Sequence, residues 1–143
     1  MFDKILVVCV GNICRSPSAQ YLLQNLLPNK EVASAGVAAL VGKPADKMAI
    51  AVAQEHGINL AVHQARQLTA DLCHDYDLIL VMEQAHIRAV TDIAPAVHGK
   101  TMLLGHWLGK QEIPDPYRQS REAFEHAYQL IEKATAAWAK KLI

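Results

Sequence analysis

The chain has 143 residues, of which 52% are hydrophobic, and its 14 Lys and Arg residues balance its 14 Asp and Glu residues. This length and hydrophobic content suffice for one sizeable core, so we expect a single domain over residues 1–143. The formal net charge of zero argues against nucleic acid or an anionic membrane surface as a partner, so any anion site must be local.

The three cysteines form an odd set, which argues against a framework of disulfides. The sequence shows no secretory h-region at its N-terminus and no apolar run long enough for membrane insertion. We therefore expect a protein of the reducing cytoplasm, whose thiols are candidates for chemistry.

Segments with the patterns of strands and helices alternate along the chain. An apolar run at 5–8 predicts a buried strand, and leucines at helical spacing up to Leu27 predict a helix with Pro17 in its first turn. The further expected elements are strands at 32–35, 77–82 and 101–104 and helices at 45–56, 85–90 and 121–142, the last capped by Ser120. This alternation predicts an α/β fold with a parallel sheet covered on both faces.

The stretch CVGNICRSPSAQ, residues 9–20, follows the first expected strand and leads into the first helix. Open parallel sheets bind ligands beyond the carboxyl ends of their strands, and backbone N–H groups at a helix start form a nest for anions. These N–H groups and the positive end of the helix dipole also favour the thiolate form of Cys9. The planar guanidinium of Arg15 offers two donors to a phosphate. Gly11 allows a close backbone approach or a positive φ, and Asn12 tolerates the left-handed region.

Four stretches resemble the low-molecular-weight protein tyrosine phosphatases: CVGNICRSPSAQ, SAGV at 34–37, HQARQL at 63–68 and IPDPYR at 113–118. The stretch GHW…EIPDPYR especially resembles the bacterial branch of this family, which is associated with capsule and exopolysaccharide export. The resemblance extends essentially from end to end. It implies three layers with a central four-stranded parallel sheet, a phosphate loop between the first strand and the first helix, and no metal or organic cofactor. It also implies hydrolysis of phosphotyrosine through a cysteinyl-phosphate intermediate.

The implied partner is a phosphotyrosine protein, namely a tyrosine autokinase that governs polysaccharide polymerisation or export. The sequence is compatible with a monomer or a weak dimer.

Asp115 is the candidate general acid. A cysteine nucleophile needs an activated thiolate, an anion cradle and an acid that protonates the leaving phenolate. Pro114 and Pro116 flank Asp115 and stiffen its loop, so the carboxyl group can be held over a pocket. Cys9 would then attack phosphorus while Arg15 and the loop amides bear the charge, and Asp115 would donate a proton and later activate water.

The resemblance also implies roles for residues around the phosphate loop. Ser16 is expected to hydrogen-bond the sulfur of Cys9, and Asn12, Ser34 and His63 to hold the loop in its shape, although His63 could also be an ordinary residue at a helix edge. The residues expected to form or support the loop are Val10, Gly11, Asn12, Ile13, Cys14, Ser16, Ser34 and His63.

Two segments are expected to wall the substrate cleft. Tyr117 is the aromatic candidate on one side, with a packed loop tyrosine as the alternative, and Leu40 and Val41 lie in the loop of the opposite wall. Arg118 stands where many eukaryotic relatives have a second tyrosine, so a regulatory switch based on that tyrosine is not expected.

The other two cysteines are Cys14, for which two interpretations remain open, and Cys73. The resemblance implies that Cys14 can form a disulfide with Cys9 under oxidation, and simple packing of Cys14 beneath the loop is the alternative. Cys73 is expected to pack on the face of a helix.

Other classes share part of this pattern. Thioredoxin-coupled arsenate reductases have the same fold and Cys-five-Arg loop, but they need two further cysteines, and here Cys73 stands alone. A phosphate- or phosphoprotein-binding module would need neither Asp115 nor the Ser16 hydroxyl. Zinc binding by Cys9 and Cys14 lacks further ligands at suitable spacing, and plain loop packing is the simplest alternative. Hydrolysis of an aryl phosphate in the presence of EDTA would separate the phosphatase from these.

Overall fold

The computed structural model describes residues 2–143. In chain order its elements are β1 (Lys4–Cys9), α1 (Arg15–Leu26), β2 (Glu31–Gly36), α2 (Lys47–Glu55), α3 (Ala70–Asp75), β3 (Leu78–Val81), α4 (Gln84–Ile93), the 3₁₀ helix η1 (Pro95–Lys100), β4 (Thr101–Leu103) and α5 (Arg121–Leu142).

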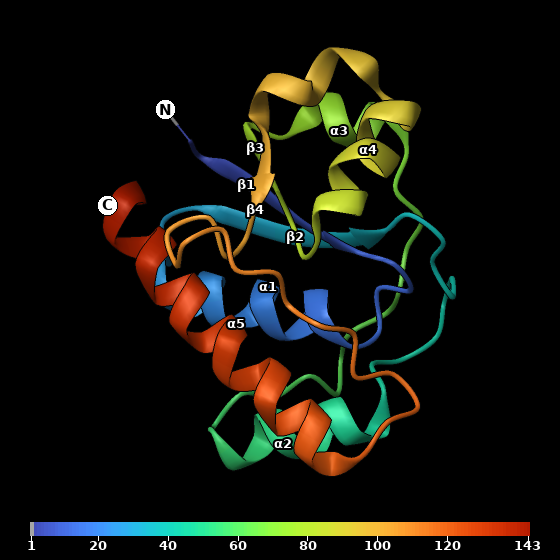
Figure 1. The fold of residues 1–143 in the computed structure, drawn as a ribbon, viewed down its shortest axis with the longest axis vertical. Coiled ribbons are helices and arrows are strands. Elements are labelled where there is room, and N and C mark those ends of the chain that lie inside the picture. The colour runs from blue at the N-terminus through green and yellow to red at the C-terminus, as the bar shows by residue number, and fades with distance from the viewer. Residues whose placement is uncertain (1) are drawn as a thin grey trace.

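The four strands form one parallel sheet in the order β2-β1-β3-β4 (Figure 1). Its two central strands are β1 and β3, and every side chain of β3 is buried, as expected for a strand covered on both faces. The predicted α/β class with a four-stranded parallel sheet is therefore confirmed. All four strands run in the same direction, so the loops that follow β1 and β3 emerge side by side at one edge.

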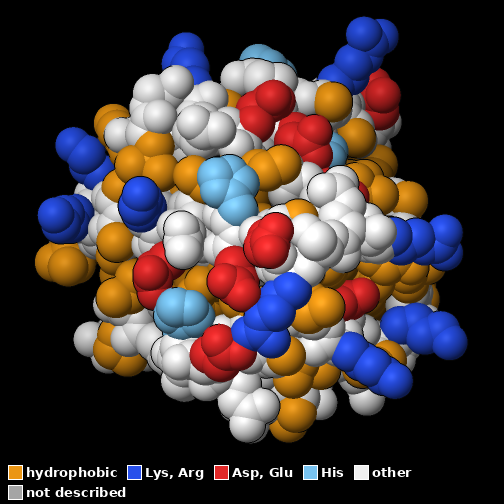
Figure 2. Space-filling model, turned by 60° about the horizontal axis from the view of Figure 1, so that its bottom comes forward, with side chains coloured by type: hydrophobic (Ala, Val, Ile, Leu, Met, Phe, Trp, Pro, Cys, Tyr) orange, Lys and Arg blue, Asp and Glu red, His pale blue; other side chains and the backbone are white. Residues whose placement is uncertain are grey.

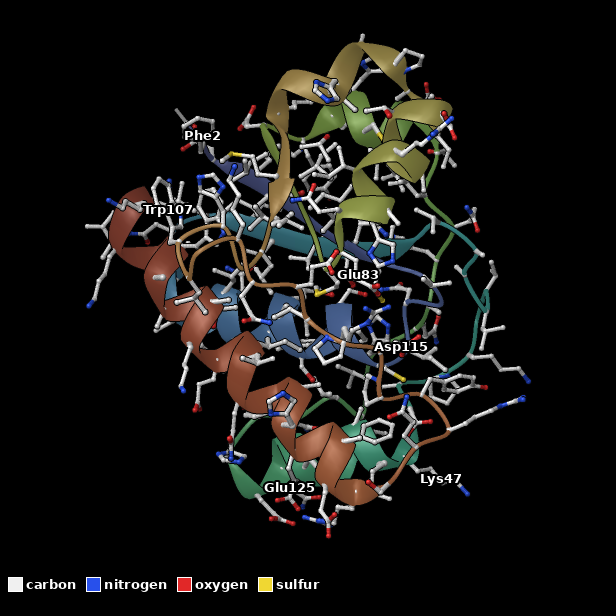
Figure 3. All side chains as sticks on the ribbon, viewed as in Figure 1. Phe2, Lys47, Glu83, Trp107, Asp115 and Glu125 are labelled. Atoms are coloured by element: carbon white, nitrogen blue, oxygen red, sulfur yellow. The ribbon has the colours of Figure 1, made fainter. Side chains whose placement is uncertain are left out.

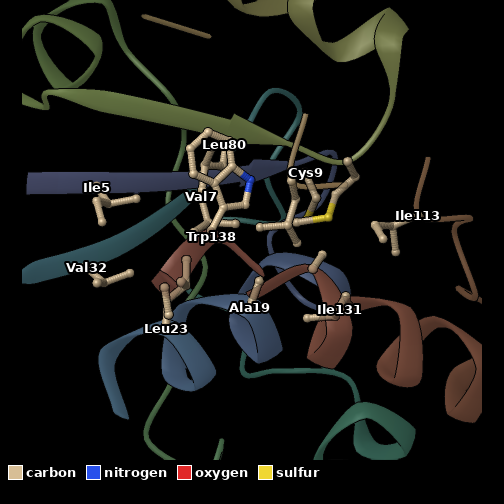
Figure 4. Close-up of a cluster of buried hydrophobic side chains, with 14 of the residues drawn as sticks. Ile5, Val7, Cys9, Ala19, Leu23, Val32, Leu80, Ile113, Ile131 and Trp138 are labelled. Atoms are coloured by element: carbon tan, nitrogen blue, oxygen red, sulfur yellow. The ribbon is translucent and has the colours of Figure 1, made fainter. Parts of the chain in front are cut away.

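Helices cover both faces of the sheet. Successive side chains of β1 point to opposite faces, so Ile5, Val7 and Cys9 pack toward α1 and α5 (Figure 4), whereas Leu6 and Val8 pack toward α3, α4 and η1. Helix α2 lies farther from the sheet and packs against α1 and α5 through a third cluster of buried side chains. Cys9 thus ends a strand that is buried from Ile5 onward, at the edge where ligands bind in such sheets.

Most boundaries agree with the expected elements, and the differences have local causes. Helix α5 has the predicted bounds, and Ser120 caps it by accepting a hydrogen bond from the Ala123 amide at 3.3 Å. Helix α4 continues to Ile93, beyond the expected 85–90. Helix α3 and η1 have six residues each, too few for a helical period to be recognised. No helix within residues 2–143 combines the length and apolarity needed to cross a membrane.

Candidate active site

The loop between β1 and α1 turns its carbonyl groups outward. The carbonyl oxygens of residues 9–13 all accept hydrogen bonds from other segments: four from backbone amides of residues 37–46, at 2.8–3.1 Å, and one from Nε2 of His63 at 2.6 Å. The N–H and C=O of a planar trans peptide point in opposite directions, so the N–H groups of the loop face its interior. Within residues 2–143, the N–H groups of residues 10–14 donate to no other group. The loop is therefore a nest of free donors.

Helix α1 adds its uncapped N-terminus to this nest. Its N-cap residue is Cys14, whose side chain makes no capping hydrogen bond, and its first turn contains no acidic residue. In contrast, α2, α3 and α5 are capped by the side chains of Asp46, Thr69 and Ser120. The first N–H groups of a helix lack partners within the helix and carry a partial positive charge, so the start of α1 is suited to an anion.

Asn12 holds the turn of the loop. Its φ of 59° lies in the left-handed region, which asparagine tolerates better than most residues, and its side chain is fully buried. The Asn12 Oδ1 accepts from the amide of Arg66 at 3.0 Å, which ties the loop to a distant segment. Gly11 was expected to allow either a close approach or a positive φ, but the positive φ belongs to Asn12 alone among the residues of this loop.

A chain of hydrogen bonds leads from Asn12 to the sulfur of Cys9. Asn12 Nδ2 donates to both the Ser16 hydroxyl, at 2.7 Å, and the Ser34 hydroxyl, at 3.0 Å. Ser34 in turn donates to Gln20 Oε1 at 2.6 Å. Since the Ser16 oxygen already accepts from Asn12, its own proton is available for Cys9 Sγ, which lies 2.9 Å away. The network thus supplies a donor to the sulfur of Cys9.

His63 lies in the segment between α2 and α3 rather than at a helix edge. Its side chain is buried, and this burial lowers the pKa of its imidazole below the ordinary value. A neutral ring that donates from Nε2 satisfies the Asn12 carbonyl, so His63 supports the shape of the phosphate loop.

Gly36 lets the next strand approach the loop closely. It ends β2 opposite Cys9, and a Cβ atom at this position would lie 2.3 Å from the Val10 carbonyl oxygen. No side chain fits there without moving the backbone of the loop.

The guanidinium of Arg15 is 2% exposed and is held by two groups. Its Nη1 donates to Glu83 Oε2 at 2.5 Å and to the carbonyl of Ile113 at 2.9 Å. Nε and Nη2 lie on the adjacent edge, so a phosphate can be bound there through two oxygens. Glu83 therefore orients the arginine for the anion cradle.

Glu83 is a residue that the sequence reasoning missed. It is the N-cap of α4 (Figure 3). Its carboxylate accepts from Arg15, which lies 68 positions earlier in the sequence. Its amide donates to Nδ1 of His86 at 3.2 Å, and burial lowers the pKa of that imidazole, so a neutral His86 supports the turn. The available signal was an acidic residue directly after the buried strand at 77–82, at the edge where ligands bind.

Replacing Glu83 by glutamine should weaken catalysis by up to about 10²-fold in kcat/KM, since a guanidinium displaced by about 1 Å can cost that much. Glu112→Gln is the matched control, because it removes a nearby charge whose carboxylate accepts from the Gln84 amide and not from Arg15. Steady-state kinetics with p-nitrophenyl phosphate measure both variants. Equal losses in the two would mean that Glu83 acts only through its charge.

Arg15, Asp115, Cys9, Leu40 and Tyr117 line one cavity of about 160 Å³. This is about ten times the roughly 15 Å³ that one bound water needs, so a phosphate group can enter. Asp115 Oδ2 lies 3.6 Å from Arg15 Nη2, and Asp115 Oδ1 accepts from the Tyr117 amide at 3.1 Å.

The remaining lining of this cavity comes from Val10, Gly11, Ile13, Cys14 and Ala38. Val41 belongs to the same loop as Leu40, as expected, but it does not line the cavity and is 67% exposed. Val41 is in a turn that is closed by a hydrogen bond from the Lys43 amide to the Leu40 carbonyl at 3.0 Å.

The three cysteines are all free and buried, in different surroundings. Cys14 lines the same cavity as Cys9, and burial raises the pKa of its thiol well above the ordinary value. Cys73 packs beneath the opposite face of the sheet, as part of α3. Cys73 therefore cannot relay oxidation from Cys9 as the arsenate-reductase alternative requires. Among residues 2–143, no group of three or more His, Cys, Asp or Glu side chains could hold a metal ion, so the zinc alternative lacks its ligands.

Comparison with known proteins agrees with this site. The family model described as low molecular weight phosphotyrosine protein phosphatase matches residues 4–143. The low molecular weight protein-tyrosine-phosphatase Wzb of Salmonella typhimurium is 58% identical over 99% of this chain and 95% of its own. The structure of Vibrio vulnificus Wzb in complex with benzylphosphonate is 63% identical, with a TM-score of 0.97 and 99% of both chains covered. Wzb of Escherichia coli K30 in complex with sulphate is 55% identical, with a TM-score of 0.98 and 100% of both chains covered.

The chain therefore belongs to the low molecular weight phosphotyrosine protein phosphatase family. It is a protein-tyrosine phosphatase, and it resembles the bacterial enzyme Wzb over nearly its whole length. The predicted family and its bacterial branch are thereby confirmed.

Proposed function

We propose that the enzyme hydrolyses phosphotyrosine in proteins in two steps, through a cysteinyl-phosphate intermediate. In the first step the Cys9 thiolate attacks phosphorus, the bond from phosphorus to the tyrosyl oxygen breaks, and Asp115 donates a proton to the leaving phenolate. In the second step Asp115 takes a proton from water, which attacks phosphorus and releases phosphate from the sulfur.

The residues around Cys9 stabilise this transfer. The inward N–H groups of the loop, the start of α1 and the free edge of Arg15 surround the position of the equatorial phosphoryl oxygens, where negative charge is spread during transfer. The Ser16 hydroxyl donates to the sulfur, which makes Cys9 a better leaving group in the second step.

One observation carries the proposal: a buried cysteine, a buried arginine and a half-exposed carboxylate line one cavity at an uncapped helix start. A binding module would have no use for the carboxylate of Asp115 over the cavity. Benzylphosphonate, which the Vibrio vulnificus relative binds, carries a phenyl ring next to a phosphonate and so resembles the proposed substrate.

The test is release of phosphate from a phosphotyrosine peptide in the presence of EDTA, with the corresponding phosphoserine peptide as control. Rapid acid quenching followed by mass spectrometry should detect a phosphate on the peptide that contains Cys9. Binding without phosphate release would favour the phosphoprotein-binding module, and turnover without a phosphorylated Cys9 would reject the two-step mechanism.

For the physiological substrate we propose a tyrosine autokinase that controls polysaccharide export, in a cytoplasmic setting. The resemblance to Wzb supports this proposal. A purified autokinase phosphorylated on its tyrosine-rich tail should lose phosphate faster than an unrelated phosphotyrosine protein at equal concentration. Equal rates for the two would remove the autokinase as the preferred substrate.

Cys14 should protect Cys9 during oxidation. Peroxide converts the Cys9 thiolate to a sulfenic acid, and attack by the Cys14 sulfur forms a disulfide and releases water. Because burial raises the pKa of the Cys14 thiol, the thiolate form of Cys14 is scarce at neutral pH, and capture should accelerate as the pH rises. After peroxide and then dithiothreitol, wild type should recover most of its activity, and Cys14→Ser should recover little.

Cys73→Ala is the control for this experiment, because Cys73 lies beneath the other face of the sheet. It should recover as wild type does. If Cys14→Ser recovers equally, Cys14 only packs beneath the loop.

A further inference from the structure

The rim of the active-site cavity carries positive charge, although the chain as a whole is neutral. The two walls belong to loops 37–46 and 114–120, and the basic residues in and next to these loops are Lys43, Lys47, Arg118 and Arg121. Arg121 forms ion pairs with Glu55 and Glu125, which leaves Lys43, Lys47 and Arg118. All three are exposed. Both loops reach the right-hand side of the fold in Figure 1, and Lys and Arg side chains gather along the right-hand edge in Figure 2. Lys47 lies on the same side as Asp115 in Figure 3.

Arg118 is held at the mouth of the cavity. Its guanidinium carbon lies 5.2 Å from the centre of the Tyr117 ring, and that ring lines the cavity. The backbone is fixed in a turn, in which Arg118 has a φ of 61° and the Gln119 amide donates to the Pro116 carbonyl at 2.9 Å. A guanidinium that lies over an aromatic ring keeps the N–H groups on its edges free for a carboxylate.

Lys43 occupies the opposite wall. Its amide donates to the Leu40 carbonyl at 3.0 Å, and its carbonyl accepts from the Ala65 amide at 2.9 Å, so its backbone is anchored beside the Leu40 wall. A peptide that places a phosphotyrosine between Leu40 and Tyr117 therefore has a cation on each side.

Among the described residues, these cations, Lys43, Lys47 and Arg118, form no direct ion pairs with acidic side chains. The acids nearest in sequence have other partners: Asp46 accepts from the Met48 amide at 2.8 Å as the cap of α2, and Asp115 accepts from the Tyr117 amide.

We propose that this rim is a subsite for acidic side chains that flank the phosphotyrosine, so that the enzyme prefers phosphotyrosine in an acidic stretch of chain. Residues within three positions of the phosphotyrosine lie up to about 10 Å away along an extended peptide, which brings their carboxylates within reach of both walls. This inference rests on the proposed phosphotyrosine hydrolysis.

The experiment compares two phosphotyrosine peptides that differ only in having Glu or Gln at the two positions on each side. Wild type should show a kcat/KM for the Glu peptide about three- to tenfold above that for the Gln peptide, mainly through KM, as a few exposed ion pairs would give. The ratio should fall toward one in about 0.5 M salt, where exposed charges are screened. The Lys43→Gln/Arg118→Gln double variant should also bring the ratio close to one.

Lys133→Gln, which removes an exposed cation on α5, is the control for net charge and should keep the wild-type ratio. A wild-type ratio of one would overturn the subsite, and so would an equal fall in the ratio for Lys133→Gln or an unchanged ratio in the double variant. Failure of wild type to hydrolyse either peptide would instead reject the proposed function, which separates the two outcomes.

Discussion

Cys9→Ser should lose at least about 10⁴-fold in kcat, because a serine hydroxyl does not supply the thiolate that attacks phosphorus. The substitution changes one atom in a residue that is 2% exposed, and the carbonyl contacts that shape the loop come from residues 37–46 and His63. The nest should therefore still bind inorganic phosphate. Turnover of p-nitrophenyl phosphate and calorimetric titration with inorganic phosphate measure the two properties.

Cys73→Ala is the matched control for Cys9→Ser, since it removes another buried thiol on the opposite side of the sheet. It should retain turnover. Formation of a phosphoenzyme by Cys9→Ser, at the rate of wild type, would show that another residue is the nucleophile.

The second large effect is expected at Asp115. Asp115→Asn should slow hydrolysis of phosphotyrosine by about 10²–10⁴-fold, because a poor leaving group needs a proton as its bond breaks. A phosphate ester of an acidic phenol should be affected far less. Asparagine keeps the oxygen that accepts from the Tyr117 amide, so the loop should keep its shape.

A series of aryl phosphates with leaving groups of graded acidity measures this effect as the slope of log kcat/KM against leaving-group acidity. The slope should be steeper for Asp115→Asn than for wild type, while Glu112→Gln, which removes an acid next to the α4 start, should keep the wild-type slope. Parallel lines for Asp115→Asn and wild type would remove Asp115 from the role of general acid.

Some elements were predictable because their signals are local. The apolar runs that became β1 and β3 and the helical period of α5 each lie within one continuous segment. The anion-binding loop was also recognisable from the sequence, because Cys9 and Arg15 belong to one continuous segment. The backbone of Asn12 lies in the left-handed region, and the Ser16 hydroxyl forms a hydrogen bond with the Cys9 sulfur. Both observations agree with what was expected of these residues.

Glu83 was missed because its partner is distant along the chain. Glu83 and Arg15 are 68 positions apart, and their pairing depends on β1 and β3 being neighbours in the sheet.

The sequence by itself determined the α/β class and the residues of the Cys9–Arg15 loop, because buried strands, helical periods and a contiguous loop are encoded over short stretches. The family followed from the resemblance of four sequence motifs. The tertiary structure alone added Glu83 and the amides of residues 37–46 to this site, and it placed His63, which the resemblance had already indicated, against the Asn12 carbonyl. His63, Glu83 and the amides of residues 37–46 reach the loop from three separate segments, and burial leaves each polar group there dependent on a partner. The curl of the loop between β1 and α1 brings Cys14 to the cavity that Cys9 lines, while the packing of α3 places Cys73 beneath the other face of the sheet.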